Sequence, residues 1–206
     1  MMEGHPAESP IRGRRADSCR NHERIIRAAT VLLAERPEAT MDELTTAAGL
    51  GRTTVYRHFH AREQLVAEVY ATAFSGTRRL IAEAAPEACP REELLERVVA
   101  ALMRAVETYP VLANGPGPAP ATGGSDTTGY EACLEALARV MRRAQDSGLL
   151  DASLPPRWLA GSLMDDCAGA VVFSAELRGC APSPAALVRA AFERAWAAVP
   201  RDGKAW

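Results

Sequence analysis

Apolar residues recur at helical spacing along most of this chain, and the recurrence predicts an all-α fold. The first apolar stripe follows the i, i+3, i+4, i+7 rule of a helix with one buried face, through His22, Ile25, Ile26, Ala29, Leu32 and Leu33. Pro37 ends that helix, because proline lacks the backbone N–H that a helix interior requires. No segment shows the alternating pattern of a strand, and no internal repeat is found.

Two short helices are predicted next, joined by a tight connection. Residues 40–43 (TMDE) have the form of a capping box, in which the Thr40 hydroxyl and the Glu43 carboxylate each satisfy a free backbone N–H. The helix runs to about Ala48, and Gly49 then supplies a residue that tolerates positive φ. A third helix begins after only a few residues, so the two short helices must cross steeply.

The rest of the chain divides into longer helices and two segments without periodicity. Helices are predicted over residues 62–85, 90–109, 130–147, 155–178 and 183–199. Residues 1–17 mix Pro, Gly and charge and are expected to form a disordered arm, and residues 114–129 are expected to form a loop or mobile segment. We therefore expect an arm at 1–17, a small helical domain at 18–64 and a larger helical domain at 65–206.

Composition agrees with a helical protein and adds little about partners. The chain has 206 residues, of which 48% are hydrophobic and only 5% aromatic, which favours helices packed through small and straight-chain side chains. Residues 1–62 hold ten Arg and eight acidic residues, a charge of +2 within a chain of net charge -2. This imbalance favours a polyanion as the partner of residues 1–62, but it is too small to establish that the chain binds one.

Cysteine usage and hydropathy indicate where the protein works. The five cysteines are odd in number and form no C-x-x-C pair, which favours a reducing cytoplasm. The most apolar late stretch, residues 167–175, is too short to span a bilayer, and no apolar run follows the basic residues near the N-terminus. We expect a soluble, cytoplasmic protein with no membrane partner.

The stretch GLGRTTVYRHFHAREQL, residues 49–65, carries an excess of groups suited to contacting DNA. On a helical wheel Val55 and Phe59 fall together as the buried anchor, and the opposite side gathers Thr53, Tyr56, Arg57 and His60. Arg suits guanine edges, Thr suits a thymine methyl or a phosphate, and Tyr and His can hold phosphates. The alternative is an ordinary solvated helix face, but such faces usually carry Glu, Lys and Gln. The pattern therefore predicts the recognition helix of a helix-turn-helix.

Residues 22–66 also resemble the TetR family of one-component transcriptional regulators. The resemblance lies in Thr40, the Ala47-Ala48-Gly49 end of the second helix, Thr54, Tyr56-x-His58-Phe59, Arg62-Glu63 and Leu65. It implies a three-helix DNA-binding head, a helical ligand-binding body and a homodimer formed through the last two helices. Members of the family typically repress transcription from a partly palindromic double-stranded DNA operator and release it when a small molecule enters the body.

The resemblance also implies a role for each matching residue. Arg52, Thr53 and Arg57 would read bases, whereas Thr54, Tyr56, His58 and Arg62 would contact mainly the DNA backbone. Thr40 would cap the second helix and also touch phosphate.

Two departures from the family pattern remove helix caps. Gly51 and Ala61 stand where the family usually has a capping side chain, and an absent cap costs on the order of 1 kcal/mol, less for Gly. We expect a head that is loosely held in the free protein and ordered by DNA. Hydrogen exchange that gives residues 51–63 equal protection with and without operator would contradict this expectation.

Beyond residue 66 the resemblance extends only to helical layout, so the ligand-binding residues are inferred from residue type. Large, adaptable or polar side chains near residues 114–129 are the candidates: Phe74, Met103, Tyr109, Tyr130, Met141, Trp158, Met164, Asp166 and Cys167. For any one of them a place in the core is the alternative. Asp165 and Asp166 interrupt an apolar helix, and Asp166 is favoured as the one that could meet a cationic or hydroxyl-bearing ligand.

Small and large apolar side chains mix along the last two helices, as close packing between helices requires. The dimer candidates are Ala168, Phe173, Leu187, Ala191, Phe192 and Trp196. The alternative, open for about half of this set, is that they close the core of a single protomer.

Two other functional classes compete with a regulator. The chain has no G-x-S-x-G elbow, phosphate-binding loop, H-E-x-x-H or dinucleotide fingerprint, and all four histidines precede residue 61, so we predict no enzyme, catalytic residue, metal site or cofactor. A sequence-indifferent DNA-binding module would need a more basic surface than a +2 front end supplies, because nonspecific affinity comes mostly from phosphate neutralisation.

Overall fold

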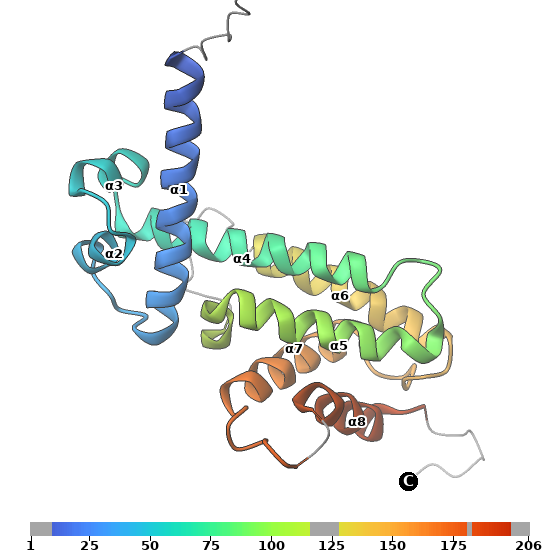
Figure 1. Ribbon diagram of the computed structural model, residues 1–206. Coiled ribbons are helices and arrows are strands. Elements are labelled where there is room, and N and C mark those ends of the chain that lie inside the picture. The colour runs from blue at the N-terminus through green and yellow to red at the C-terminus, as the bar shows by residue number, and fades with distance from the viewer. Residues whose placement is uncertain (1–9, 116–127, 181–182, 199–206) are drawn as a thin grey trace, which may run out of the picture. The chain divides into compact units, whose positions relative to one another are not determined.

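The computed structural model describes residues 10–115, 128–180 and 183–198, and helices account for its ordered elements (Figure 1). They are α1 (Pro10–Glu35), α2 (Met41–Ala48), α3 (Arg52–His58), α4 (Arg62–Ala84), α5 (Arg91–Thr108), the short 3-10 helix η1 (Pro110–Asn114), α6 (Thr128–Asp146), α7 (Pro156–Val172) and α8 (Pro184–Trp196). Within the described ranges the only extended pairing is an isolated bridge between Leu150 and Ala197. The predicted all-α fold is therefore confirmed.

The chain forms two compact units, and the division falls inside α4, after Val69. The predicted boundary between residues 64 and 65 lies near the start of the same helix. Each unit has a core of its own, so each is described by itself.

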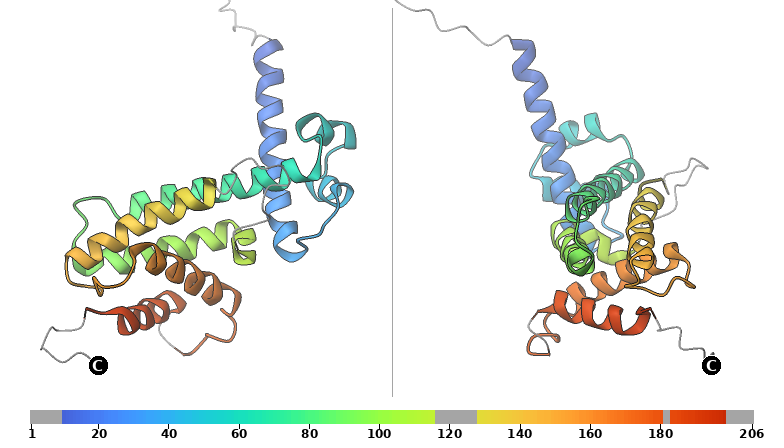
Figure 2. Two further views of the ribbon diagram at one scale, coloured as in Figure 1. Left: turned by 180° about the vertical axis from the view of Figure 1, so that it is seen from behind. Right: turned by 90° about the vertical axis from the view of Figure 1, so that its right-hand side faces the viewer.

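The first unit is held together by apolar side chains from four helices. Ile25 and Ala29 of α1, Leu44 of α2, Val55 of α3 and Leu65 of α4 are almost completely buried. Figures 1 and 2 show α2 and α3 on the same side of α1, and α2 packs directly on α1. A short turn follows α2 and leads into α3, which contacts α2.

Local signals account for the turn between α2 and α3. Thr40 caps α2, and Gly49 adopts the left-handed conformation with φ 60° while its N–H donates to the Thr46 carbonyl oxygen. A residue with a Cβ is strained at that φ, so glycine allows α2 to end and the chain to turn at once into α3.

The second unit packs α7 against both α6 and α8, and α5 contacts α7 and α8 as well (Figure 2). Its core is apolar and close to fully enclosed, and its largest buried side chains are Val98, Leu137, Met141, Leu150, Leu159, Leu163 and Phe192. None of the helices in the described ranges has the length and apolar character needed to cross a membrane.

Two predicted boundaries are wrong. Residues 10–17 belong to α1, whereas the sequence placed them in a disordered arm. Pro10 suits the first turn of a helix, and Arg and Ala have high helix propensity. Helix α7 ends at Val172 and not at residue 178; beyond it the chain turns through an exposed segment closed by Gly179 at φ 93°. Residues 1–9 of the predicted arm, residues 116–127 of the predicted loop and residue 199 lie outside the described residues.

Candidate nucleic-acid interface and ligand cavity

Helix α3 is anchored by two side chains and exposes the face opposite to them. Val55 is 0% exposed and Phe59, which follows the last turn, is 5% exposed, as the helical wheel predicts. Thr53 and Arg57 are exposed, and Tyr56 is half-buried. The structure therefore brings Thr53 and Arg57, with the half-buried Tyr56, to one outward surface of α3.

Arg52 lies at the N-terminal end of this face with weak internal partners. Its Nη1 atom is 3.4 Å from a carboxylate oxygen of Asp42, and its guanidinium lies over the Tyr56 ring at 5.2 Å from the ring centroid. Both members of the ion pair are exposed, so the pair is worth little and can be exchanged for a phosphate or a base edge.

Arg57 has no hydrogen bond or ion pair with any described residue, although Thr53 and Tyr56 lie on the same face. An exposed guanidinium with five donors and no internal partner is suited to a bidentate contact with guanine. Thr54, one residue after Thr53, is half-buried, and its contact with the DNA backbone stays a prediction.

Arg62 is engaged within the protein, which differs from its predicted contact with the DNA backbone. Its Nε donates to the carbonyl oxygen of Ala39 at 2.7 Å, and a terminal nitrogen donates to the carbonyl oxygen of Pro37. These bonds tie the start of α4 to the segment between α1 and α2. Arg62 is thus a positioning residue for the helix-turn-helix in this structure.

His58 also points inward, again in contrast to its predicted backbone contact. Its ring centroid lies 5.9 Å from that of His22 and 6.5 Å from that of Phe59, and its Nε2 is buried without a hydrogen-bond partner among the described residues. Burial, followed by the nearby charges of His22 and Arg57, lowers the pKa of the His58 imidazole below its ordinary 6.5. His58 therefore packs against His22 and Phe59 within the first unit, and its contact with the DNA backbone stays a prediction.

Thr40 forms the predicted capping box. Its backbone N–H donates to the Glu43 carboxylate at 2.7 Å, its hydroxyl donates to the same carboxylate at 2.9 Å, and the Glu43 backbone N–H lies 3.4 Å from the hydroxyl oxygen. These Thr40 donors lower the pKa of Glu43, and Arg36, 2.6 Å away, lowers it further. A phosphate contact by Thr40 stays a prediction.

The two helix starts that lack a usual capping residue differ in what replaces it. Gly51 provides no side-chain cap for α3. Before α4, the side chain of Gln64 reaches back and accepts a hydrogen bond from the His60 backbone N–H at 3.0 Å. This bond fixes the chain just before α4, but it does not replace a side-chain oxygen at Ala61, which would accept from the second or third N–H of the helix.

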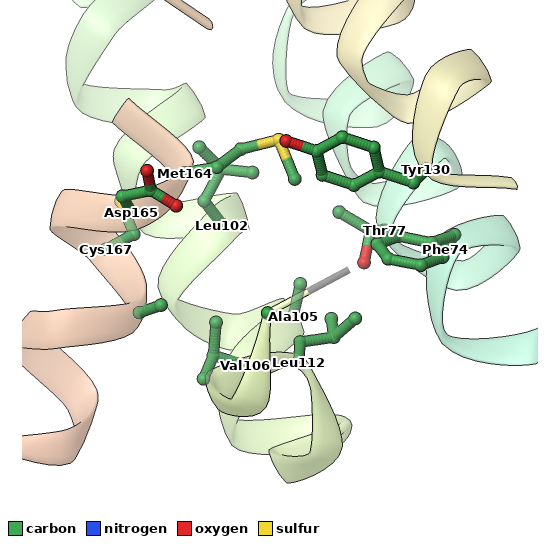
Figure 3. A pocket seen from close by; sticks show the side chains of 12 residues that line it. Phe74, Thr77, Leu102, Ala105, Val106, Leu112, Tyr130, Met164, Asp165 and Cys167 are labelled. Carbon is green, nitrogen blue, oxygen red and sulfur yellow. The ribbon is translucent and has the colours of Figure 1, made fainter. Parts of the chain in front are cut away.

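The second unit contains a cavity of about 60 Å³ between its helices (Figure 3). Side chains from α4, α5, η1, α6 and α7 line it, most of them apolar: Phe74, Thr77, Leu102, Ala105, Val106, Leu112, Gly115, Tyr130, Met164, Asp165, Cys167 and Ala168.

The structure places only part of the predicted ligand set on this cavity. Phe74, Tyr130, Met164 and Cys167 line it. Met103 and Met141 instead lie in the core, because their positions on α5 and α6 face the packed side of the unit.

Tyr109 and Trp158 are also away from the cavity lining. Tyr109 lies against the backbone of Gly76, where a Cβ atom would approach its hydroxyl oxygen to 2.3 Å. Trp158 is 46% exposed and meets Trp196 edge to face at a centroid distance of 4.7 Å.

The structure reverses the expectation for the acidic pair. Asp165 lines the cavity, and Asp166 does not. Successive residues of a helix point about 100° apart, so the rotation of α7 set by its packing on α6 and α8 selects one of the two carboxylates. Thr77, Leu102, Ala105, Val106 and Leu112 were missed, because small and aliphatic residues on a helix carry no signal that separates a cavity wall from a core.

The predicted dimer residues fall into two groups, one exposed or half-buried and one inside the protomer. Phe173 is 57% exposed, Ala191 is exposed, and Leu187 and Trp196 are half-buried, so all four can reach a partner. Phe192 is 2% exposed and belongs to the core of the protomer, and Ala168 lines the cavity. In residues 10–115, 128–180 and 183–198, no three His, Cys, Asp or Glu side chains gather in a way that could hold a metal ion.

Comparison with known proteins gives the first unit a family. Residues 25–69 match the model of the bacterial regulatory proteins of the tetR family. A stretch of 80 residues is 32% identical to the HTH-type transcriptional repressor LfrR of Mycolicibacterium smegmatis, and this match covers 39% of the chain and 42% of LfrR. The aligned stretch therefore spans less than half of that relative.

Solved structures extend the likeness of fold to most of the chain. The TetR-like regulator LfrR of Mycobacterium smegmatis, solved with proflavine, has a TM-score of 0.61 and 22% identity, over 85% of this chain and 93% of LfrR. A regulatory protein of the tetR family from Rhodococcus RHA1 has a TM-score of 0.70 at 14% identity, over 87% of this chain and 98% of its own. Residues 25–69 therefore match the tetR family of bacterial regulatory proteins, and most of the chain shares the helical fold of solved TetR-like regulators.

Proposed function

We propose that the protein is a ligand-responsive, sequence-specific DNA-binding transcriptional regulator, a repressor that leaves a palindromic operator when a small molecule binds the second unit. The outward face of α3 carries the proposal. On this face Arg57 lies next to the exposed Thr53 and makes no hydrogen bond or ion pair with a described residue. Such a face, on a short helix anchored by Val55 and Phe59, has the form that enters a major groove.

The contact residues have different proposed roles. Arg52, Thr53 and Arg57 read base edges, and Thr54 and Tyr56 contact the DNA backbone. Arg62 and His58 support the position of α3 from inside the unit, given their internal contacts.

Selection of genomic fragments with the purified protein tests sequence-specific binding. We expect recovered fragments to share two related half-sites, and the cognate duplex to bind far more tightly than random duplex at physiological salt. Equal affinity for cognate and random duplex would contradict the proposal and favour a sequence-indifferent DNA-binding module.

The effector is proposed to bind the cavity of the second unit. The support is the apolar, partly aromatic lining and the bound proflavine of the LfrR structure, whose fold this chain shares. Compounds that raise the melting temperature of the protein are expected to release it from its operator. Stabilising compounds that bind the cavity and leave operator affinity unchanged would contradict the ligand-responsive part of the proposal.

A homodimer that works in the cytoplasm, where its DNA lies, completes the proposal. Val172 and Phe173 near the end of α7 are 55% and 57% exposed, and large apolar residues exposed together are typical of an interface. Two heads related by a twofold axis would read two half-sites.

The family match also bears on the alternative that the protein is an enzyme. Its members are regulatory proteins, which agrees with the prediction that the chain is not an enzyme. Substrate turnover by the purified protein in the absence of DNA would contradict that prediction.

A further inference from the structure

Two arginines lie on the outward face of α3, and they differ in what surrounds them. Arg57 is exposed and makes no hydrogen bond or ion pair with a described residue. Arg52, at the start of the same helix, lies against a carboxylate and an aromatic ring. The position of the Arg52 guanidinium is therefore set by its neighbours, whereas that of Arg57 is not.

The first neighbour of Arg52 is Asp42 of α2. Nη1 of Arg52 lies 3.4 Å from Oδ1 of Asp42 and 3.5 Å from Oδ2, so one terminal nitrogen faces the middle of the carboxylate. The Nε and Nη2 atoms make no hydrogen bond with a described residue. These two atoms share one edge of the planar guanidinium, and their parallel N–H bonds form the fork that suits a bidentate acceptor.

The second neighbour of Arg52 is Tyr56, one turn further along α3. The Arg52 Cζ atom lies over the Tyr56 ring at 5.2 Å from the ring centroid. A guanidinium is attracted to the face of an aromatic ring, and the half-buried Tyr56 side chain is itself partly held by the unit. Asp42 therefore limits the rotation of the guanidinium in its plane, and Tyr56 limits its tilt.

Asp42 is placed by the fold of the helix-turn-helix. It lies in the first turn of α2, which the Thr40 cap begins, and its carbonyl oxygen accepts a hydrogen bond from the Thr46 hydroxyl at 2.9 Å. The turn at Gly49 brings α3 into contact with α2. The ion pair thus joins two helices across ten residues of sequence.

The pair is weak in water, because the side chains of Arg52 and Asp42 are 68% and 64% exposed. A DNA surface that covers it removes water, and the lower local dielectric strengthens the attraction between two charges that stay together. On DNA a weak pair is either exchanged for another acceptor or retained. The geometry favours retention, because the forked edge suited to a base is the edge that Asp42 leaves free.

We propose that Asp42 is a positioning residue for base recognition, which holds Nη1 of Arg52 and, with Tyr56, presents the Nε and Nη2 edge to O6 and N7 of one guanine. The inference rests on the proposed function in taking α3 as the helix that enters the major groove. A bidentate guanine contact requires the guanidinium to lie in the plane of the base, whereas a phosphate accepts a cation from many directions. Without Asp42, Arg52 turns to a nearby phosphate.

The test measures base preference at single positions of an operator recovered by the genomic selection. Each base pair of one half-site is replaced in turn, and the affinity of the full chain for every duplex is measured by fluorescence anisotropy at fixed salt. Arg52→Ala identifies the pair that Arg52 reads, and Arg57→Ala identifies the pair that Arg57 reads. Asp42→Ala is then compared with Glu38→Ala, which removes a carboxylate that is also exposed in the first unit and has no ion pair with a described residue.

We expect Asp42→Ala to lower the preference for guanine at the position read by Arg52 by about fivefold or more. The preference at the position read by Arg57 should stay unchanged. Affinity for random duplex should rise, and its salt slope should steepen by about one, because Arg52 gains a phosphate. Glu38→Ala should keep the preference at both positions, because it alters the charge of the unit and not the direction of Arg52.

A second pair of variants tests the aromatic support and leaves Asp42 in place. Tyr56→Phe and Tyr56→Leu both lack the hydroxyl, but only Phe keeps a ring face against Arg52. Tyr56→Phe should retain the guanine preference at the position read by Arg52, and Tyr56→Leu should lower it. Thermal melting checks that each variant is folded, and this pair decides the question if Asp42→Ala is not.

Three results would overturn the inference and leave the proposed regulator intact. They are an unchanged guanine preference in Asp42→Ala, a loss of preference spread equally over all positions, and a profile equal to that of Glu38→Ala. In each case the wild type would still select its operator. A wild type without any sequence preference would instead overturn the proposed function and this inference together.

Discussion

The Nε of Arg62 donates a hydrogen bond to the carbonyl oxygen of Ala39 at 2.7 Å, across 23 residues of sequence. The bond joins the first turn of α4 to the segment that leads into α2. A charged donor on a backbone carbonyl fixes the start of α4 against this segment, and this relationship separates residues that support α3 from residues that are proposed to contact DNA.

Arg62→Ala is accordingly expected to destabilise the first unit by about 1 kcal/mol or more, because two carbonyl oxygens lose a charged donor. Arg57→Ala, the matched control on the exposed face, should change stability by less than about 0.5 kcal/mol and alter half-site preference. Chemical denaturation and competition binding measure the two effects. Suppose instead that Arg62→Ala leaves stability unchanged, weakens binding to all DNA sequences alike and lowers the salt slope of DNA affinity by about one. That result would show that Arg62 contacts a DNA phosphate.

The lowered pKa of His58 predicts a pH dependence of stability near neutrality. Because the folded-state pKa lies below the ordinary 6.5, the unfolded chain takes up a proton first as the pH falls. The stabilisation is therefore complete above pH 6.5 and is lost as the pH falls through the folded-state value.

Thermal unfolding measured on either side of pH 6.5 checks this dependence. His58→Phe should weaken it, because phenylalanine keeps the packing against His22 and Phe59 without a titratable nitrogen. The exposed His60→Phe is the control and should leave the dependence in place. A wild-type slope retained in full by His58→Phe would assign the effect to another group.

Gly76→Ala is expected to destabilise the second unit, although alanine normally stabilises a helix interior by about 0.5–1 kcal/mol relative to glycine. The reason is Tyr109: the added Cβ would approach its hydroxyl oxygen to 2.3 Å and its ring carbons to 2.6 Å. The ring would have to leave the backbone of α4.

A double-mutant cycle with Tyr109→Ala isolates this contact by chemical denaturation. In the Tyr109→Ala background, Gly76→Ala should become neutral or stabilising. Additive effects of the two substitutions would show that the close approach does not limit the site.

Phe173→Glu is expected to reduce the proposed homodimer to monomers, because Phe173 is 57% exposed at the end of α7 and a carboxylate there would be buried without a partner at the interface. Sedimentation at micromolar concentration measures the mass. Val31→Glu, which replaces a 51% exposed side chain of the first unit, is the control and should stay dimeric. A monomeric wild type, or a dimeric Phe173→Glu, would contradict the proposed interface.

Features of this protein that depend on neighbours in sequence could be predicted from the sequence itself. The capping box joins Thr40 to Glu43 three residues away, and Gly49 ends α2 through its own backbone conformation. Val55 and Phe59 were identified as the anchor of α3 because helical period alone places them together. The all-α fold and the exposed face of α3 follow from signals of this range.

Features that join distant segments were decided only by the tertiary structure. Arg62 reaches Ala39, and His58 packs on His22, so two apparent DNA contacts are directed inward. On α7, Asp165 and Asp166 differ only in rotation about the helix axis, which packing against α6 and α8 fixes. Helical period states which residues share a face, but the partner of each face depends on contacts between helices that are far apart in the chain.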